Sequence, residues 1–220
     1  HFTWDSCCRN GAISNLVLSS PTSPSEGFTL RASMFPFYDN LGNLVPADPC
    51  FDSSPIFNES PKTIICTGYP FSYSHNASDD ELDEVYYAWD EPLDDFFGAY
   101  NPPVAPAPLP FVAPYSYDNP LPGGVTLDTV TGEISYNSTT SGNFVTVVRI
   151  DAYKCDQLVA QIFREIQAVL IACPTLSGGT NNIPPTISPP FTDPITGLPS
   201  YSTTVPAGGT ISFQIHSDDF

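Results

Sequence analysis

The strongest candidate for metal chemistry is a short acidic run, Asp79-Asp80-Glu81-Leu82-Asp83-Glu84, which places five carboxylates within six residues. Carboxylate oxygens are the ligands that Ca²⁺ prefers, and a hard cation would relieve the repulsion between these side chains. The whole chain has 24 acidic and six basic residues, a formal net charge of −18, so few basic side chains are available to neutralise this run. A solvated acidic loop that only keeps the surface soluble is the alternative.

Six cysteines, at positions 7, 8, 50, 66, 155 and 173, form the second set of reactive side chains. None lies in a Cys-x-x-Cys pair, and the three histidines are scattered along the chain, which argues against a zinc site. An even number of cysteines without metal spacing is typical of disulfides formed in an oxidising compartment. We therefore expect disulfide bonds and an extracellular location.

Enzyme signatures are absent from the sequence, which contains no Gly-x-Ser-x-Gly, no His-Glu-x-x-His and no phosphate-binding glycine loop. Adjacent carboxylates such as Asp94-Asp95 arise by chance in so acidic a chain, and His75 is more simply a structural histidine than a catalytic base. The negative charge disfavours nucleic acid and anionic lipid as partners. No apolar run is long enough to span a membrane. The sequence predicts a protein that is not an enzyme.

The elements that carry these residues are expected to be short β-strands. Twenty-five prolines and fourteen glycines exclude long helices through most of the chain and fit short strands joined by fixed turns. Strand patterns cover residues 12–18, 28–35, 63–66, 69–75, 85–89, 125–127, 133–136 and 143–150. The stretch 158–172 matches both a helical stripe and a strand, and its β-branched content favours a strand, with 161–172 as the last one of a sandwich.

Residues 90–122 combine nine prolines with six aromatic side chains. A disordered linker would seldom carry so many aromatics, so this segment is expected to be an ordered, extended meander. Its aromatics are best explained as a cover over their own sandwich. Docking of a neighbouring subunit and stacking on sugar rings are the alternatives.

An internal repeat sets the expected domain organisation. Thr67-Gly68-Tyr69, which leads to Ser78-Asp79-Asp80, resembles Ala207-Gly208-Gly209, which leads to Ser217-Asp218-Asp219, and each follows a proline-rich entry. Residues 1–57 are then the end of a preceding β module. Residues 58–174 form a complete module, and 175–220 form a linker and the start of a further module.

Three segments carry a family resemblance. They are Ser6-Cys7-Cys8-Arg9-Asn10-Gly11-Ala12-Ile13, then Asp52–Phe57 running into Ile65–Phe71, and Asn119–Pro122 leading to Leu127–Ile134. Together they resemble the repetitive PKD/cadherin-like extracellular proteins of Bacteroidetes, large type IX-secreted surface proteins that include gliding-motility-associated adhesins. The resemblance implies all-β, tandem Ig-like sandwich modules with a structural and adhesive role at the bacterial cell surface. The short, turn-separated strands agree with a sandwich.

Two other functions stay open at this point. One is a self-assembling filament or surface-layer subunit, and the other is an accessory carbohydrate-binding domain of a secreted enzyme. The expected partners are neighbouring modules of the same chain, with self-assembly or surface glycans as further candidates.

The resemblance also implies specific sites. In such a sandwich the first strand runs parallel to the last and beside it, which predicts a bridge between Cys66 and Cys173. Cys155, in the hairpin before the last strand, is then expected to pair with Cys7, Cys8 or Cys50.

The usual calcium-liganding positions of similar modules fall on Asp79, Glu81 and Asp83, while Leu82 stands where those modules carry Gly. Asp128-Thr129-Val130 matches the sequence that Bacteroidetes glycosylate on oxygen, with Thr129 as the acceptor. An ordinary turn before Thr131-Gly132 is the alternative.

Overall fold

The structure is a computed structural model that describes residues 1–45, 53–95, 106–173, 186–215 and 217–218. The chain divides into two compact units, His1–Ala172 and Cys173–Phe220. Every regular element in the described ranges is a β-strand and none is a helix, so the predicted all-β class is confirmed. Accordingly, the described residues contain no helix that could cross a membrane.

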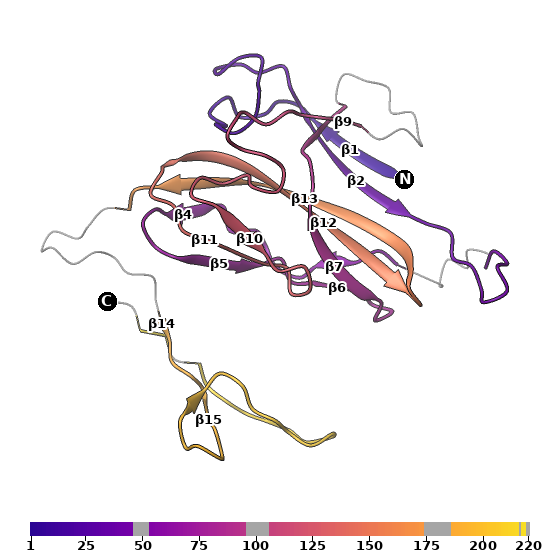
Figure 1. Cartoon of the computed structure of the whole chain (residues 1–220), viewed down its shortest axis with the longest axis vertical. Coiled ribbons are helices and arrows are strands. Elements are labelled where there is room, and N and C mark those ends of the chain that lie inside the picture. Colours follow the sequence, from indigo (N-terminus) through magenta and orange to yellow (C-terminus); the bar gives the residue numbers. More distant parts are fainter. Residues whose placement is uncertain (46–52, 96–105, 174–185, 216, 219–220) are drawn as a thin grey trace, which may run out of the picture. The chain divides into compact units, whose positions relative to one another are not determined.

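The larger sheet of the first unit is built on one long hairpin, β12 (Gly142–Lys154) paired with β13 (Gln157–Ile171) (Figure 1). β7 (Glu84–Trp89) pairs with the other edge of β12. β13 in turn pairs with β2 (Phe28–Met34) and, in parallel, with β4 (Ile64–Cys66). The stretch 158–172, whose sequence matches both a helical stripe and a strand, is therefore a strand, because it lies between pairing partners on both sides.

Three more strands extend this sheet beyond β2. β1 (Phe2–Ser6) and β8 (Leu93–Asp94) both pair with β2, and β9 (Ala107–Pro108) pairs with β8. Residues from the first 45 positions thus belong to the same sheet as β13. The module boundary expected after residue 57 does not separate two units, because β2 hydrogen-bonds directly to β13. The division after Ala172 lies two residues from the expected end at 174.

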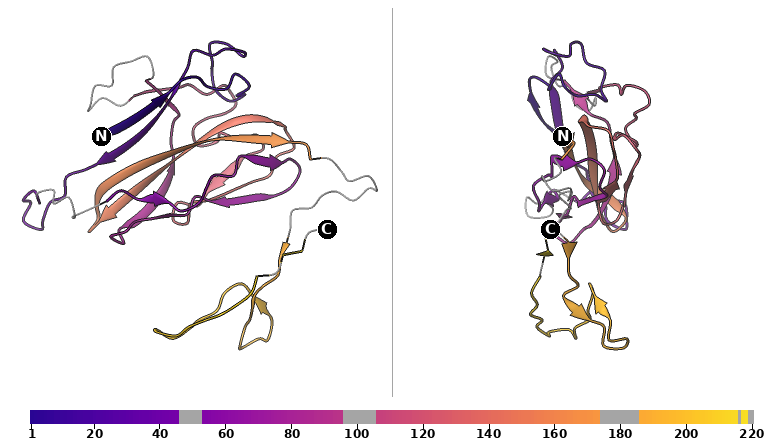
Figure 2. Two further views of the ribbon diagram at one scale, coloured as in Figure 1. Left: turned by 180° about the vertical axis from the view of Figure 1, so that it is seen from behind. Right: turned by 90° about the vertical axis from the view of Figure 1, so that its left-hand side faces the viewer.

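A second, three-stranded sheet covers one face of the hairpin (Figure 2). Its order is β10 (Val125–Leu127), β11 (Glu133–Tyr136), β5 (Phe71–Ser74). Apolar side chains from the two layers form the core, with Phe144 and Leu170 of the long hairpin packing against Phe71 and Tyr136. This two-layer packing is consistent with a β-sandwich. The short strands β3 (Ile56–Phe57) and β6 (Ala77–Ser78) pair with each other beside it.

Irregular segments cover the opposite face of β12. Ile13 and Leu16 pack with Val145, Val147 and the side chains of Leu109 and Phe111. Because β12 is buried on both faces, its central residues 144–148, Phe-Val-Thr-Val-Val, are mostly apolar rather than alternating. The strand predicted at 12–18 is wrong, since only isolated bridges form at Ile13 and Leu16.

A buried asparagine holds these irregular segments in place. The Asn15 side chain is fully buried, donates to the carbonyls of Pro120 (2.9 Å) and Val145 (2.8 Å), and accepts from the Val145 amide (2.9 Å). Tyr115 packs on the buried Phe144 ring. In its described part, 106–122, the proline–aromatic segment therefore acts as the predicted cover, while residues 96–105 lie outside the described ranges.

The second unit contains two short antiparallel pairs. β14 (Thr186–Ile187) pairs with β17 (Ser217–Asp218), and β15 (Phe191–Thr192) pairs with β16 (Pro199–Ser200). Its large apolar side chains remain exposed, among them Ile195 at 91% and Ile215 at 62%. It therefore lacks the two-sided core of the first unit in its described residues.

Candidate functional site

The acidic loop is organised around one buried carboxylate. Asp79 is only 6% exposed, and its Oδ1 accepts hydrogen bonds from the amides of Glu81 (3.0 Å) and Asp83 (3.2 Å). Leu82 takes a left-handed backbone, φ 63°, which is the conformation that favours Gly. The loop thus keeps the turn that the Gly of similar modules would support, with Leu in that position.

The other two predicted calcium ligands face different partners. Glu81 accepts from the Ser53 hydroxyl (2.7 Å) and amide (3.1 Å), bonds that hold the pKa of Glu81 below its usual value. Asp83 lies 3.3 Å from the Lys154 ammonium. No group of three or more His, Cys, Asp or Glu side chains in the described ranges could hold a metal ion. The calcium hypothesis for Asp79, Glu81 and Asp83 therefore gains no support, because backbone amides, a serine and a lysine relieve the repulsion that suggested it.

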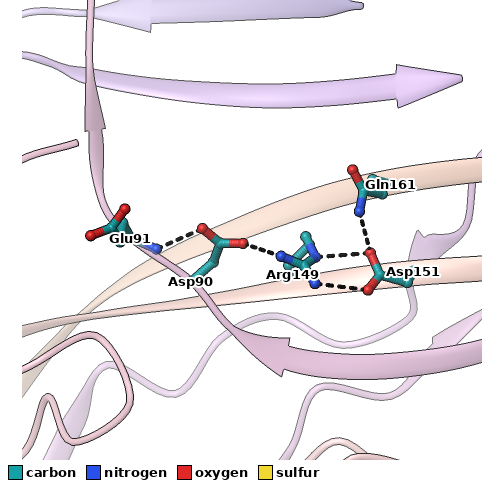
Figure 3. A network of polar contacts seen from close by, with 5 residues as sticks. All are labelled: Asp90, Glu91, Arg149, Asp151 and Gln161. Carbon is teal, nitrogen blue, oxygen red and sulfur yellow. Dashed lines mark hydrogen bonds and ion pairs between the residues drawn. The ribbon is translucent and has the colours of Figure 1, made fainter. Parts of the chain in front are cut away.

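The few basic side chains are used inside the first unit. Arg149 binds Asp90 (2.6 Å) and, through two nitrogens, Asp151 (2.8 and 3.0 Å), and Gln161 donates to Asp151 (2.7 Å) (Figure 3). The hydrogen bonds that Arg149 donates to Asp151 raise the pKa of Arg149. Ion-paired carboxylates of this kind are poor general acids or bases, so the network is a clamp that joins β12, β13 and the end of β7.

A second buried ion pair joins Arg9 to Glu165 of β13, and Arg9 also donates to the Leu93 carbonyl (3.1 Å). Arg164 stacks 3.6 Å above the centre of the Phe57 ring and donates to the Tyr73 hydroxyl (3.0 Å). Because these arginines are engaged in contacts within the first unit, fewer basic side chains remain on the surface to offset the acidic ones than the composition implies.

The cysteines correct one expectation. Cys7 and Cys8 are joined to each other, and Cys155 is free and exposed, so Cys155 does not pair with Cys7 or Cys8. The reason is local. Cys155 and Asp156 form the two-residue turn between β12 and β13, both with left-handed φ (48° and 61°), and this turn leaves Cys155 exposed.

Cys66 and Cys173 are both disulfide-bonded. Cys50 lies outside the described residues, and the bridge between Cys66 and Cys173 stays a prediction. Cys66 stands opposite Ile171 in the parallel pairing of β4 with β13. The disulfides indicate an oxidising, non-cytoplasmic environment.

The predicted glycosylation sequence forms a tight turn. Asp128 Oδ1 accepts from the amides of Val130 (2.8 Å) and Thr131 (2.9 Å), and Gly132 takes φ 68°. Thr129 is exposed, and its carbonyl accepts from the Tyr87 amide (2.8 Å). The turn interpretation is thus sufficient for these residues, and the modification of Thr129 stays a prediction.

The second unit contains the same turn, which the sequence reasoning missed. Asp193 Oδ1 accepts from the amides of Ile195 and Thr196 (both 2.8 Å), and Gly197 takes φ 70°. The flanking strand pairs also correspond, Leu127 with Ile134 and Thr192 with Pro199. The shared Asp-x-x-Thr-Gly spacing is a signal that could have revealed it.

One further pair of segments recurs. In the first unit β3, after a proline-rich entry, pairs with β6, which leads into Ser78-Asp79. In the second unit β14, also after prolines, pairs with the strand Ser217–Asp218. The repeat seen in the sequence is therefore also a repeat of strand pairing.

A partly apolar surface lies where β2 diverges from β13. A cavity of about 320 Å³ is lined there by Phe2, Trp4, Leu30, Phe57, Ile162 and Phe163, among others. Phe2 and Trp4 are 70% and 57% exposed. A second cavity, of about 330 Å³, lies further along and includes Arg9, Phe28, Leu30, Glu165 and Gln167. We call these two cavities, together with residues 163–168 of β13, the β13 slot.

His75 lies close to this region but is inaccessible. It is 1% exposed, and its ring packs between Tyr73 (5.3 Å between centroids) and Phe57 (6.2 Å). Burial, with a smaller contribution from Arg164, lowers the pKa of His75 to about 4, so the ring is neutral at physiological pH. A buried neutral ring among aromatics fits the structural role expected for it.

Comparison with known proteins adds no name to this description. No family model matches the chain, and none of the curated proteins matches it. What the geometry defines is an all-β protein with disulfides and a repeated turn, so its function must be argued from these features.

Proposed function

We propose that the chain is a structural and adhesive piece of a large secreted bacterial cell-surface protein, built from tandem Ig-like β-sandwich modules. The observation that carries this proposal is the turn that recurs in both units with the same hydrogen bonds and the same strand register. Recurring supersecondary units along one chain are typical of repeat arrays. Extracellular stalks are commonly built as such arrays.

The predicted bridge between Cys66 and Cys173 gives a mechanical reason for the proposal. Cys66 ends the first strand of the predicted module, and Cys173 follows its last strand. A pulling force that enters before Cys66 and leaves after Cys173 would pass through the sulfur–sulfur bond and would bypass the sandwich between them. A module that must transmit load without unfolding gains directly from such a link.

Pulling single molecules by their two ends tests this role. In oxidising buffer, the roughly 100 residues between the two cysteines should stay folded as force rises. Reduction, or replacement of both residues by Ser, should add a step of about 350 Å, at about 3.5 Å per residue. A molecule that extends to the same length in both buffers, without an unfolding step, would contradict a load-bearing role.

A second function has one observation in its favour. Phe2 and Trp4 are exposed beside a cavity, and aromatic faces next to a groove can stack on sugar rings. An accessory carbohydrate-binding role predicts that the chain binds particular glycans on an array and that Trp4→Ala abolishes this binding. Leu41→Ala, at a side chain 86% exposed elsewhere in the first unit, is the matched control. An array without any bound glycan would dismiss this second function.

A further inference from the structure

One edge of β13 is incompletely paired. β12 runs along one side of β13 for almost its whole length. On the other side, β2 covers only residues 160–162 and β4 only 169–171. Between them, residues 163–168 have no neighbouring strand among the described residues. A strand edge with free backbone groups is a template for another strand.

The hydrogen bonds at both ends of this gap show which backbone groups face it. The Phe35 amide donates to the Val159 carbonyl (2.8 Å), the Val169 amide donates to the Thr63 carbonyl (2.6 Å), and the Ile171 carbonyl accepts from Thr67 (2.8 Å). Odd-numbered residues of β13 therefore point away from β12. Because backbone direction alternates along a strand, the amides and carbonyls of Phe163, Glu165 and Gln167 also face the gap. No hydrogen bond joins them to another described residue.

The side chains around the gap form a place for an incoming segment. Both cavities of the β13 slot border this edge, and Leu30 lines each of them. The first is lined in part by four aromatic side chains, and the second contains the Arg9–Glu165 pair. A bound extended strand would place side chains beside these cavities while its backbone pairs with β13, the arrangement of β-strand addition.

The second unit contains a segment suited to this edge. Residues 210–215, Thr-Ile-Ser-Phe-Gln-Ile, alternate polar and apolar side chains over six positions, the length of the gap. All six are exposed, with Ile211 at 40%, Phe213 at 51% and Ile215 at 62%, and none belongs to a strand. The segment carries no charge, so it adds no repulsion toward a chain of net charge −18. Alternating β-branched and aromatic residues without a sheet favour pairing with a free edge.

We propose that residues 210–215 of one copy of this chain add as a strand to β13 of a second copy, at Phe163, Glu165 and Gln167. The donor and acceptor surfaces are different, so the contact is heterologous and can continue from copy to copy. The proposal does not depend on the adhesive role proposed above. It would also hold for a filament subunit, and its failure would leave that adhesive role untouched.

Sedimentation of the full oxidised chain at about 0.15 M salt, where surface charges are screened beyond about 8 Å, tests the contact over a hundredfold range of concentration. The average mass should rise with concentration. The double variant Ile211→Asp, Phe213→Asp should remain a monomer, because it brings two carboxylates into the paired segment. The control Ile195→Asp, Val205→Asp carries the same added charge at exposed apolar positions of the same unit and should assemble like the unmodified chain.

Amide exchange at single residues locates the contact. The amides of Phe163, Glu165 and Gln167 should exchange about tenfold more slowly at high than at low concentration, while Arg164 and Ile166, which face β12, stay protected throughout. In the double variant, exchange at these three amides should no longer slow as the concentration rises, while exchange elsewhere should be unchanged. A chain that is monomeric at every concentration, assembly that persists in the double variant, or unchanged exchange at the three amides would each overturn the proposal.

Discussion

The same turn is built twice in this molecule, with the same backbone hydrogen bonds but with different surroundings. In both, an Asp carboxylate accepts hydrogen bonds from the amides two and three residues further along the chain, and the Gly that follows adopts φ near 70°. At Gly132 a Cβ atom would overlap the Tyr87 ring, whereas at Gly197 it would meet nothing within 4 Å. The local sequence is therefore enough to form the turn. Stability comes from the sheets that pack over the first copy, whereas the described residues of the second unit place no such sheet over the second copy.

The largest effect should come from the bridge predicted between Cys66 and Cys173. Substituting Ser at both positions should remove the predicted bond and lower the free energy of unfolding of the first unit by about 4–5 kcal/mol, the entropy of closing a loop of roughly 100 residues. Denaturant melts without reductant would measure it. The turn at Asp193 should keep its amide exchange rates, since no part of it lies in that loop. Equal loosening of both turns would contradict the division into independent units.

Matched glycine substitutions compare the two turns directly. Gly132→Ala should destabilise the first unit by about 3 kcal/mol, because it combines a left-handed backbone with overlap on the Tyr87 ring. Gly197→Ala should affect only the second unit, by about 1 kcal/mol from the backbone alone. Thermal melting of the first unit and amide exchange in the second would report the two effects. The contrast would be lost if Gly132→Ala melted like the unmodified chain.

Between pH 7 and 5, acid should weaken the first unit through His75. Its pKa is about 4 in the folded chain and near 6.5 when unfolded, so protons bind the unfolded chain more tightly between these values. The stability is complete above pH 6.5 and falls as the pH drops toward 4, by about 2 kcal/mol at pH 5. Arg164, Tyr73 and Phe57 surround the ring. In His75→Phe, unfolding measured between pH 7 and 5 should lose this slope, and an unchanged slope would assign it to other groups.

The smallest effect concerns a third left-handed position, where the residue is not Gly. Leu82 has φ 63° and is 89% exposed, so replacing it by Gly removes backbone strain without removing packing. Leu82→Gly should stabilise the first unit by up to about 1 kcal/mol, after the greater freedom of Gly in the unfolded chain is subtracted. Denaturant midpoints would show the gain. A loss of stability would mean that the Leu82 side chain makes contacts of its own.

Local chemistry explains which parts of the fold could be predicted from the sequence. The strands at 125–127 and 133–136 have the expected bounds because the Asp-x-x-Thr-Gly turn fixes them. The parallel position of β4 beside β13 followed from the sandwich topology. The sequence of 12–18 alternates like a strand but is held by the buried Asn15 side chain instead of a ladder. The membership of β2 in the main sheet depends on pairing over more than 100 residues of separation, which no local pattern reveals.

The candidate site was less predictable than the fold. Charge crowding in the acidic loop suggested a cation, but the loop uses its amides, Ser53 and Lys154 for the same purpose. The β13 slot has no sequence motif, because it lies where the described residues place no strand between the short pairings of β13 with β2 and β4. Only the pairing register shows that Phe163, Glu165 and Gln167 face it.

Residue-resolved amide exchange of the intact oxidised chain at neutral pH tests the central claim most directly. The Gly132 and Gly197 amides make the same hydrogen bond, to the carbonyls of Asp128 (2.9 Å) and Asp193 (2.8 Å). If packing of the first unit stabilises one copy of a turn that is otherwise local, Gly132 should exchange at least a hundredfold more slowly than Gly197. Equal exchange rates at the two glycines would contradict the account.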